Sequence, residues 1–271
     1  MVNVKGAEFL KKTGWVNPTD VRDTALQYAL NIPNTTYFEW MAQNPAVGAR
    51  FGSMMTAQAT GKPTWSQEHF YPVERLSHAE DDAALLIVDI GGGKGHDLVD
   101  FGQRHPQIKG KLVVQEMPYM VEQMQGKLDG VEYMVHDFNQ PQPVQGKLSR
   151  RRGRTKFHRL THTSIAGASA YFLHQILHDY DDETCRNILR QILPAMRKGH
   201  SKILIQELVL ADQGAHWMAT GLDVELMLCL ASRERTESEF KRLAADVGLV
   251  VEGIWKHPHG QDSVLELVLP E

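Results

Sequence analysis

The chain has 271 residues, a formal net charge of -4 and two cysteines. This length accommodates one full α/β domain with an appendage, and the slightly acidic charge excludes a general attraction for nucleic acid or anionic membranes. Cys185 and Cys229 show neither paired nor metal-type spacing, which excludes a disulfide-stapled scaffold and fits a reducing compartment.

No targeting or membrane signal is visible. The first six residues lack the apolar core of a signal peptide, and no apolar run approaches the length of a membrane span. We therefore expect a soluble, cytoplasmic protein.

Residues 1–75 are predicted to form helical pieces separated by turns, because Asn-Pro and Gly-x-Pro signals recur through them. The segment is too interrupted to hold a large core, and we expect it to pack across the mouth of the following domain. Candidate pocket walls there are Phe38, Met41, Met54 and Met55, although methionines on a helix face more often belong to an ordinary core.

Residues 76–271 are predicted to form one Rossmann-like domain. An apolar run over 84–88 is typical of a buried parallel strand. The segment Asp89-Ile90-Gly91-Gly92-Gly93-Lys94-Gly95 follows it and leads into a helix from His96 to about His105. A strand that breaks into glycines before a helix is typical of a nucleotide-type cofactor site, because glycine lets the backbone turn and approach the ligand.

The spacing of the glycines narrows the choice among cofactor classes. A dinucleotide pattern, G-x-G-x-x-G, would require glycine where the chain has His96, which disfavours a nicotinamide-dependent reductase. The pattern present is D-x-G-x-G-x-G, and a carboxylate at the strand end suits the ammonium and sulfonium groups of S-adenosylmethionine. The candidate cofactor-binding residues in this segment are Asp89, Gly91, Gly93 and Gly95.

Two further strands are predicted to end in acids at the same edge. The strand over 111–116 closes on Glu116, about 20 residues beyond the glycines, where a carboxylate can accept hydrogen bonds from both ribose hydroxyls. The strand over 131–135 runs into Asp137 and Phe138, which places a second acid where an adenine amino group could be met. One acid at a strand end is usually solvated, but three in succession indicate a binding site.

The remaining elements complete a seven-stranded, doubly wound sheet. A helix is predicted from about Asp182, and Thr236 with Glu239 predicts a capping box at the start of another. The further strands are predicted over 169–176, 202–207, 250–256 and 263–269.

Residues 147–167 break this composition, with seven basic residues and no acid from Lys147 to Arg159. A nucleic-acid patch is one interpretation, but no other basic surface continues it. We expect an exposed, mobile insertion without a function of its own. Its Gly-Lys and Ala-Gly ends are those that a translated, unspliced in-frame intron would leave.

The predicted fourth strand leads to the candidate catalytic residue, His178. Ligands of open α/β sheets bind beyond the carboxyl ends of the strands, and a neutral imidazole is available as a base near cellular pH. No metal is predicted, because His174 with His178, and His257 with His259, lack a further ligand at metal-type spacing.

The chain resembles the plant- and fungal-type small-molecule O-methyltransferases, such as the caffeic-acid and sterigmatocystin enzymes. The resemblance rests on the glycine motif, His178-Asp179, Glu207 at a strand end, and the segment 232–237, and it covers nearly all of the chain outside 147–167. It implies that His178 deprotonates the acceptor hydroxyl and that Glu207 and Glu234 flank and orient the histidine. It also implies cofactor contacts from Gly91, Glu116, Asp137 and His174.

The function implied is S-adenosylmethionine-dependent methylation of a hydroxyl on an aromatic or polyketide-like small molecule, by a homodimer as in the family. Two departures stand out: His174 replaces the usual plant lysine, and the chain begins after most of the family's winged-helix region. The alternative is a cofactor-binding protein that has lost methyl transfer, either a pseudoenzyme or a relative that catalyses a rearrangement or cyclisation.

Overall fold

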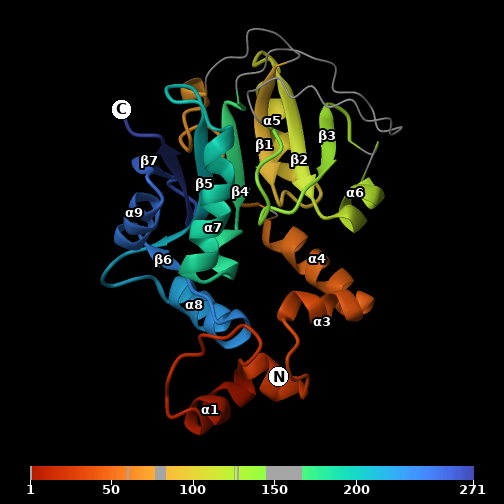
Figure 1. Cartoon of the computed structure of the whole chain (residues 1–271), viewed down its shortest axis with the longest axis vertical. Coiled ribbons are helices and arrows are strands. Elements are labelled where there is room, and N and C mark those ends of the chain that lie inside the picture. The colour runs from red at the N-terminus through yellow and green to blue at the C-terminus, as the bar shows by residue number, and fades with distance from the viewer. Residues whose placement is uncertain (1, 60, 77–83, 125, 127, 145–166) are drawn as a thin grey trace.

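The computed structural model describes residues 2–59, 61–76, 84–124, 126, 128–144 and 167–271. A mixed sheet forms the centre of this part of the chain (Figure 1), with its path of seven strands in the order β3-β2-β1-β4-β5-β8-β7. This order confirms the predicted Rossmann-like sheet. The strands of the path are β1 Leu85–Ile90, β2 Lys111–Glu116, β3 Val131–Val135, β4 Ala170–His174, β5 Lys202–Leu210, β7 Val250–Lys256 and β8 Asp262–Val268.

Strands β1 to β5 run parallel to one another, whereas β8 is antiparallel to both β5 and β7. The carboxyl ends of the five parallel strands therefore meet at one edge. A further two-residue strand, β6 Arg235–Thr236, pairs with Val209 and Leu210 of β5. Strand β6 was not predicted from the sequence, and it carries an arginine to this edge.

Apolar side chains that alternate along the strands fill two cores, one on each face of the sheet. On one face, Val88 and Ile90 pack with residues of helices α7 and α9. On the other face, Ile87 packs with residues of α5 and with Trp65. The helices of this domain are α5 His96–Arg104, α6 Pro118–Met124, α7 Asp182–Ile192, α8 Trp217–Leu230 and α9 Glu237–Asp246, with short 3-10 turns η1 Val73–Arg75, η2 Leu177–Asp179 and η3 Leu193–Ala195.

Some predicted boundaries were wrong. The fourth strand was predicted over 169–176 but ends at His174, because Gln175 takes a left-handed φ of 53° and the chain turns into η2. The fifth strand continues beyond Glu207 to Leu210, where β6 supplies it with a new partner. The capping box of α9 is confirmed, with Thr236 and Glu239 bonded reciprocally.

The amino-terminal segment is helical, as predicted, and consists of α1 Val2–Lys12, α2 Ala25–Leu30, α3 Tyr37–Gln43 and α4 Pro45–Ala59. These helices lie beyond the carboxyl edge of the parallel strands (Figure 1). Helices α1 and α2 pack against α8 through Phe9, Ala25 and Leu228. A Cβ on Gly6 would lie 2.9 Å from Leu228 Cδ1, so only glycine allows this close approach.

A buried carboxylate of the sheet binds two side chains of the segment between α4 and β1. Glu266 of β8 is fully buried and accepts hydrogen bonds from the Tyr71 hydroxyl at 2.6 Å and the Arg75 guanidinium at 2.9 and 3.0 Å. Lys202 donates to the same carboxylate at 3.2 Å. This clasp fixes the segment that connects the amino-terminal helices to the sheet.

Two expectations meet the limits of the described chain. The insertion predicted at 147–167 lies outside the described residues except for Gly167, which is buried. Within the described ranges, none of the helices combines the length and apolar character that a bilayer crossing requires.

Candidate active site

The glycine loop follows β1 at the carboxyl edge of the sheet. Gly91, Gly93 and Gly95 have φ of 72°, 56° and 72°, in the left-handed region that favours glycine. The amide of Gly95 donates to the carbonyl of Gly92 at 2.8 Å, which closes the turn into α5. The loop thus has the tight course that the sequence predicted.

A buried carboxyl group, that of Asp89, lies against this loop at Gly92. Asp89 is fully buried, and neither of its oxygens has a hydrogen-bond partner among the described residues. Burial raises the pKa of Asp89 well above its usual value, and the nearby charge of Asp97 adds to the effect. A Cβ on Gly92 would lie 2.2 Å from Asp89 Oδ2, so any larger residue at 92 would strike this carboxyl group. Gly92 was not among the residues predicted for the site, although it stands inside the glycine motif.

Glu116, at the end of β2, is aimed at the glycine loop. Its Oε1 accepts from the Gly93 amide at 3.1 Å, and its Oε2 accepts from the Met117 amide at 2.7 Å. Burial raises the pKa of Glu116, and these two amides offset part of the rise. The strand-end acid Glu116 therefore lies directly beside the glycine loop.

The turn after β3 carries the next two candidate cofactor residues, Asp137 and Phe138. Asp137 is exposed and accepts from both the backbone and side-chain amides of Asn139, at 2.9 and 3.0 Å. The ring of Phe138 meets that of Tyr180 edge-on, with centroids 5.8 Å apart. Burial raises the pKa of Tyr180, and the charges of carboxylates that include Asp137 and Glu116 raise it further. Asp137 and Phe138 thus lie beside the turn after β4.

His174, the last residue of β4, is tied to the helix that follows the glycine loop. Its Nδ1 lies 2.8 Å from Asp97 Oδ2, in the first turn of α5. Burial lowers the pKa of His174, but the charge and hydrogen bond of Asp97 outweigh this and the pKa is raised. The predicted cofactor residue therefore bridges β4 and α5.

The candidate base, His178, lies on η2 and is 8% exposed. Its Nδ1 donates to Glu234 Oε1 at 3.0 Å, and its Nε2 lies 3.5 Å from Asp179 Oδ1. Burial lowers the pKa of His178, but the hydrogen bond to Glu234 and the charges of Glu207 and Asp179 raise it more, to about 9. Because Glu234 occupies Nδ1, Nε2 is the nitrogen left to accept a proton.

Two acids flank the histidine, as expected, but they hold different parts of it. Glu234 contacts the imidazole, whereas Glu207 accepts from the backbone amides of Leu177 at 2.5 Å and His178 at 3.2 Å. Burial raises the pKa of Glu207. One oxygen of each acid, Oε2, is buried without a hydrogen-bond partner in the described part of the chain. The backbone role of Glu207 could not be seen in the sequence.

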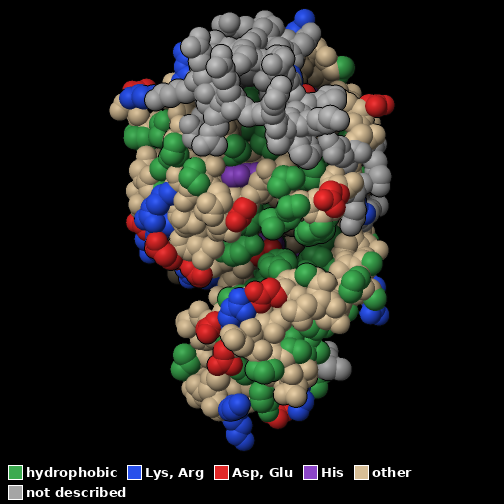
Figure 2. Space-filling view, turned by 45° about the vertical axis from the view of Figure 1, so that its right-hand side comes forward, with side chains coloured by type: hydrophobic (Ala, Val, Ile, Leu, Met, Phe, Trp, Pro, Cys, Tyr) green, Lys and Arg blue, Asp and Glu red, His purple; other side chains and the backbone are tan. Residues whose placement is uncertain are grey.

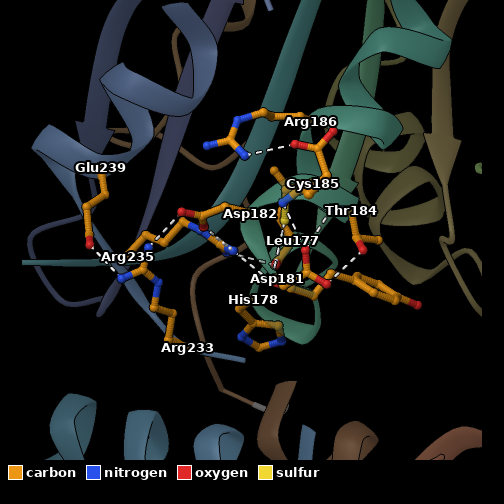
Figure 3. A network of polar contacts seen from close by, with 12 residues as sticks. Leu177, His178, Asp181, Asp182, Thr184, Cys185, Arg186, Arg233, Arg235 and Glu239 are labelled. Atoms are coloured by element: carbon orange, nitrogen blue, oxygen red, sulfur yellow. Dashed lines mark hydrogen bonds and ion pairs between the residues drawn. The ribbon is translucent and has the colours of Figure 1, made fainter. Parts of the chain in front are cut away.

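An arginine that was not singled out from the sequence donates hydrogen bonds to backbone carbonyls in and next to η2 (Figure 3). Arg235 is 1% exposed and donates to the carbonyls of Leu177 at 2.8 Å and Tyr180 at 2.7 Å, and to Asp182 Oδ1 at 3.0 Å. Its neighbour Arg233 donates to the other oxygen of Asp182 at 2.8 Å. The ring of His178 points away from these arginines (Figure 3).

The turn η2, which carries His178, and the glycine loop lie side by side. The Cδ1 atom of Ile176 would lie 2.7 Å from a Cβ on Gly91, so the side chain before η2 packs on the loop itself. Burial raises the pKa of Tyr37, the first residue of α3, to about 12, and the charges of Cys229, Asp179 and Glu225 add to this rise. Helix α8 contacts both η2 and the amino-terminal helices α1 and α2, and so connects that segment to the turn that carries His178.

Apolar side chains gather on the middle of the face in Figure 2, with acidic and histidine side chains among them. Across the described ranges, no group of three or more His, Cys, Asp and Glu side chains is arranged to hold a metal ion.

Known proteins are similar to this chain in sequence and in fold. A family model described as an O-methyltransferase domain matches residues 67–250. The methyltransferase cfoC of Aspergillus candidus is 33% identical over 264 residues, which cover 96% of this chain and 59% of the relative. The O-methyltransferase penC of Penicillium thymicola is 32% identical over 262 residues, covering 96% and 60%. The chain spans about 60% of the length of these relatives.

Solved structures extend the likeness to three dimensions. The complex of LepI with SAM has a TM-score of 0.81 at 29% identity, with 99% of this chain and 63% of that chain covered. The complex of OxaC with sinefungin and meleagrin has a TM-score of 0.80 at 26% identity and the same coverage. A structure described as a pericyclic reaction enzyme has a TM-score of 0.81 at 30% identity, covering 99% and 64%.

Proposed function

The chain belongs to the O-methyltransferase family, and from that premise we propose that it transfers the methyl group of S-adenosylmethionine to a hydroxyl of an aromatic or polyketide-like small molecule. His178 is the general base. The observation that carries the proposal is the orientation of its imidazole. Glu234 holds Nδ1 at 3.0 Å, which leaves Nε2 as the proton acceptor, on a turn that packs against the glycine loop.

The residues around the loop fit S-adenosylmethionine. Gly92 leaves a space against Asp89 that any Cβ would fill, and Glu116 presents a carboxylate beside the Gly93 amide. Glu116 would hold the ribose hydroxyls, Asp137 and Phe138 the adenine, and the loop with Asp89 and His174 the remainder. When bound, the cofactor supplies an electrophilic methyl group on a sulfonium. The similar structure of LepI, solved as a complex with SAM, supports this choice.

The acceptor site is proposed to lie between His178 and the amino-terminal segment 1–75, with 76–271 as the cofactor-binding domain. Support comes from helix α8, which contacts η2 as well as the amino-terminal helices α1 and α2. Phe38 and Met54 are exposed on α3 and α4, at 37% and 46%. With Met41 and Met55 they remain the proposed walls for an apolar acceptor.

The raised pKa of His178 eases the proton transfer. A phenol has a pKa near 10, so transfer to an ordinary histidine is uphill by about 3.5 pKa units, or ~5 kcal/mol. With His178 at about 9, the gap falls to about one unit, or ~1.4 kcal/mol. The cost is that the imidazole is mostly protonated at neutral pH, so His178 must first lose a proton before it can act.

Methyl transfer is therefore expected to depend on alkaline pH. Since only the neutral imidazole accepts a proton, kcat/KM should rise about tenfold per pH unit on the acid side and level off near pH 9. The measurement is kcat/KM against pH for a phenol whose own pKa lies near 10. An acid limb centred near the ordinary histidine value of 6.5, or none at all, would contradict the assigned electrostatics of His178.

The cofactor assignment is tested by replacing Glu116 with glutamine. We expect S-adenosylmethionine to bind about 30-fold more weakly, a loss of about 2 kcal/mol, because a charged acceptor of the ribose hydroxyls is removed. Isothermal titration calorimetry with S-adenosylmethionine and S-adenosylhomocysteine measures the effect. The control is Glu132→Gln, which removes an exposed carboxylate on neighbouring β3. Equal affinities in both variants would refute the ribose role of Glu116.

A second candidate function is a rearrangement or cyclisation that uses the bound cofactor without methyl transfer. The specific support is the similar structure described as a pericyclic reaction enzyme. The two candidates differ in one outcome: a protein of the second kind binds S-adenosylmethionine but leaves its methyl group in place in the presence of any acceptor.

A further inference from the structure

The turn that carries His178 has little stability of its own. Gln175 enters it with a φ of 53°, a left-handed conformation that is strained for a residue other than glycine. The turn itself is a three-residue 3-10 helix, whose hydrogen-bond geometry is poorer than that of an α-helix. Two backbone hydrogen bonds close it, from the Asp179 amide to the Ile176 carbonyl at 3.2 Å and from the Tyr180 amide to the Leu177 carbonyl at 3.1 Å. Contacts from outside must therefore hold it in place.

Two buried charged side chains supply those contacts: one accepts hydrogen bonds from backbone amides of the turn, and the other donates to its backbone carbonyls. Glu207 accepts from the amides at 177 and 178, and Arg235 donates to the carbonyls at 177 and 180. The short β5–β6 pairing, with Val209 opposite Arg235, brings Arg235 alongside the strand that carries Glu207. Glu234, which orients the imidazole, is the residue directly before Arg235 in the chain.

This contact needs the shape of an arginine. One guanidinium reaches two carbonyls and a carboxylate at once, at 2.7 to 3.0 Å. A lysine keeps the positive charge, but its three N–H donors sit on one nitrogen and lack the planar fork of a guanidinium. Arg233 provides a natural comparison, because in the described structure it contacts the same Asp182 and also Glu239 rather than the carbonyls of the turn.

We propose that Arg235 is a positioning residue for His178: its guanidinium fixes the backbone of Leu177–Asp179, so that the imidazole meets Glu234 and presents Nε2 to the acceptor. The kinetic consequences rest on the proposed methyl transfer, whereas the effect on the imidazole itself does not. In the absence of this grip, the turn is free to relax away from Glu234.

The test compares two charge-preserving variants, Arg235→Lys and Arg233→Lys. The pKa of His178 is measured by NMR on protein with isotope-labelled histidine, its resonance being identified by loss in His178→Gln. We expect Arg235→Lys to lower the pKa of His178 by about one unit or more, because the contact with Glu234 is weakened. Arg233→Lys should leave it within about 0.3 units, which corresponds to ~0.4 kcal/mol.

Kinetics provide the second readout. In Arg235→Lys we expect kcat to fall at least about tenfold, with the acid limb of the pH profile displaced to lower pH and cofactor affinity within about threefold. A drop in melting temperature with an unchanged pKa of His178 would overturn the proposal, since a merely structural arginine behaves that way. Equal pKa changes in the two variants would overturn it as well.

Two further outcomes are separated by this design. If the wild-type protein methylates no acceptor, the proposed function fails, yet the pKa comparison still decides the role of Arg235. If Arg235→Lys does not fold, Asp182→Asn replaces it, because Asp182 holds Nε of Arg235 at 3.0 Å. That variant should lower the pKa of His178 relative to Arg233→Lys, and an unchanged value would overturn the proposal.

Discussion

Replacing His178 with alanine is expected to reduce methyl transfer by about 10²- to 10⁴-fold, the usual effect of removing a general base. Cofactor affinity should stay within about threefold, because the proposed cofactor contacts lie on the glycine loop and the ends of β2 to β4. The reaction is followed by product formation from S-adenosylmethionine and a phenol, and affinity by calorimetry. This variant separates catalysis from binding more cleanly than any other in the site.

A matched control is His259→Ala, which removes an exposed histidine from the turn between β7 and β8. It should retain wild-type rates. If His178→Ala also retains them, the acceptor is captured as a preformed phenolate or another group is the base, and the mechanism proposed for His178 is wrong.

Replacing Gly92 with alanine is expected to damage the cofactor site most. The new Cβ would lie 2.2 Å from Oδ2 of the fully buried Asp89 carboxyl group. Overpacking of this kind costs about 1–3 kcal/mol. In a domain of this size that lowers the melting temperature by about 2–4 °C for each kcal/mol. Because the loop backbone must shift, we expect S-adenosylmethionine affinity to fall at least about tenfold.

Gly93→Ala distinguishes the clash from ordinary backbone strain. A Cβ there meets nothing within 4 Å, although φ is 56°, so alanine should cost only about 1–2 kcal/mol. Melting temperatures of the two ligand-free variants are compared first. If Gly92→Ala melts no lower than wild type and binds the cofactor normally, Asp89 does not support the loop as described.

The parts of the fold that depend on local sequence were predictable. Apolar runs and glycine spacing located β1 and its loop, and the capping box at Thr236 located the start of α9. Helix α8 was missed because apolar residues surround its axis and give no helical period. It packs on both the amino-terminal helices and η2, so its face against each neighbour is apolar.

The acids around His178 were predictable in identity, but the contacts that each of them makes were not. Glu207 and Glu234 were both expected beside His178, yet only the folded chain shows that one holds the backbone and the other the imidazole. Arg235 left no distinguishable signal, because a buried arginine and an exposed one look alike in a sequence. Its burial depends on the pairing of β5 with β6, which joins segments about 25 residues apart and has no local pattern.

The most direct test of the central claim is transfer of an isotope-labelled methyl group. The protein is incubated with S-adenosylmethionine labelled in that group and a panel of phenols and hydroxylated polyketides, and the products are analysed by mass spectrometry. We predict a labelled O-methyl ether, formed with an equal amount of S-adenosylhomocysteine and at a rate reduced at least about 100-fold in His178→Ala. A protein that binds S-adenosylmethionine but labels none of these acceptors, or that binds NADH in preference, would contradict this prediction.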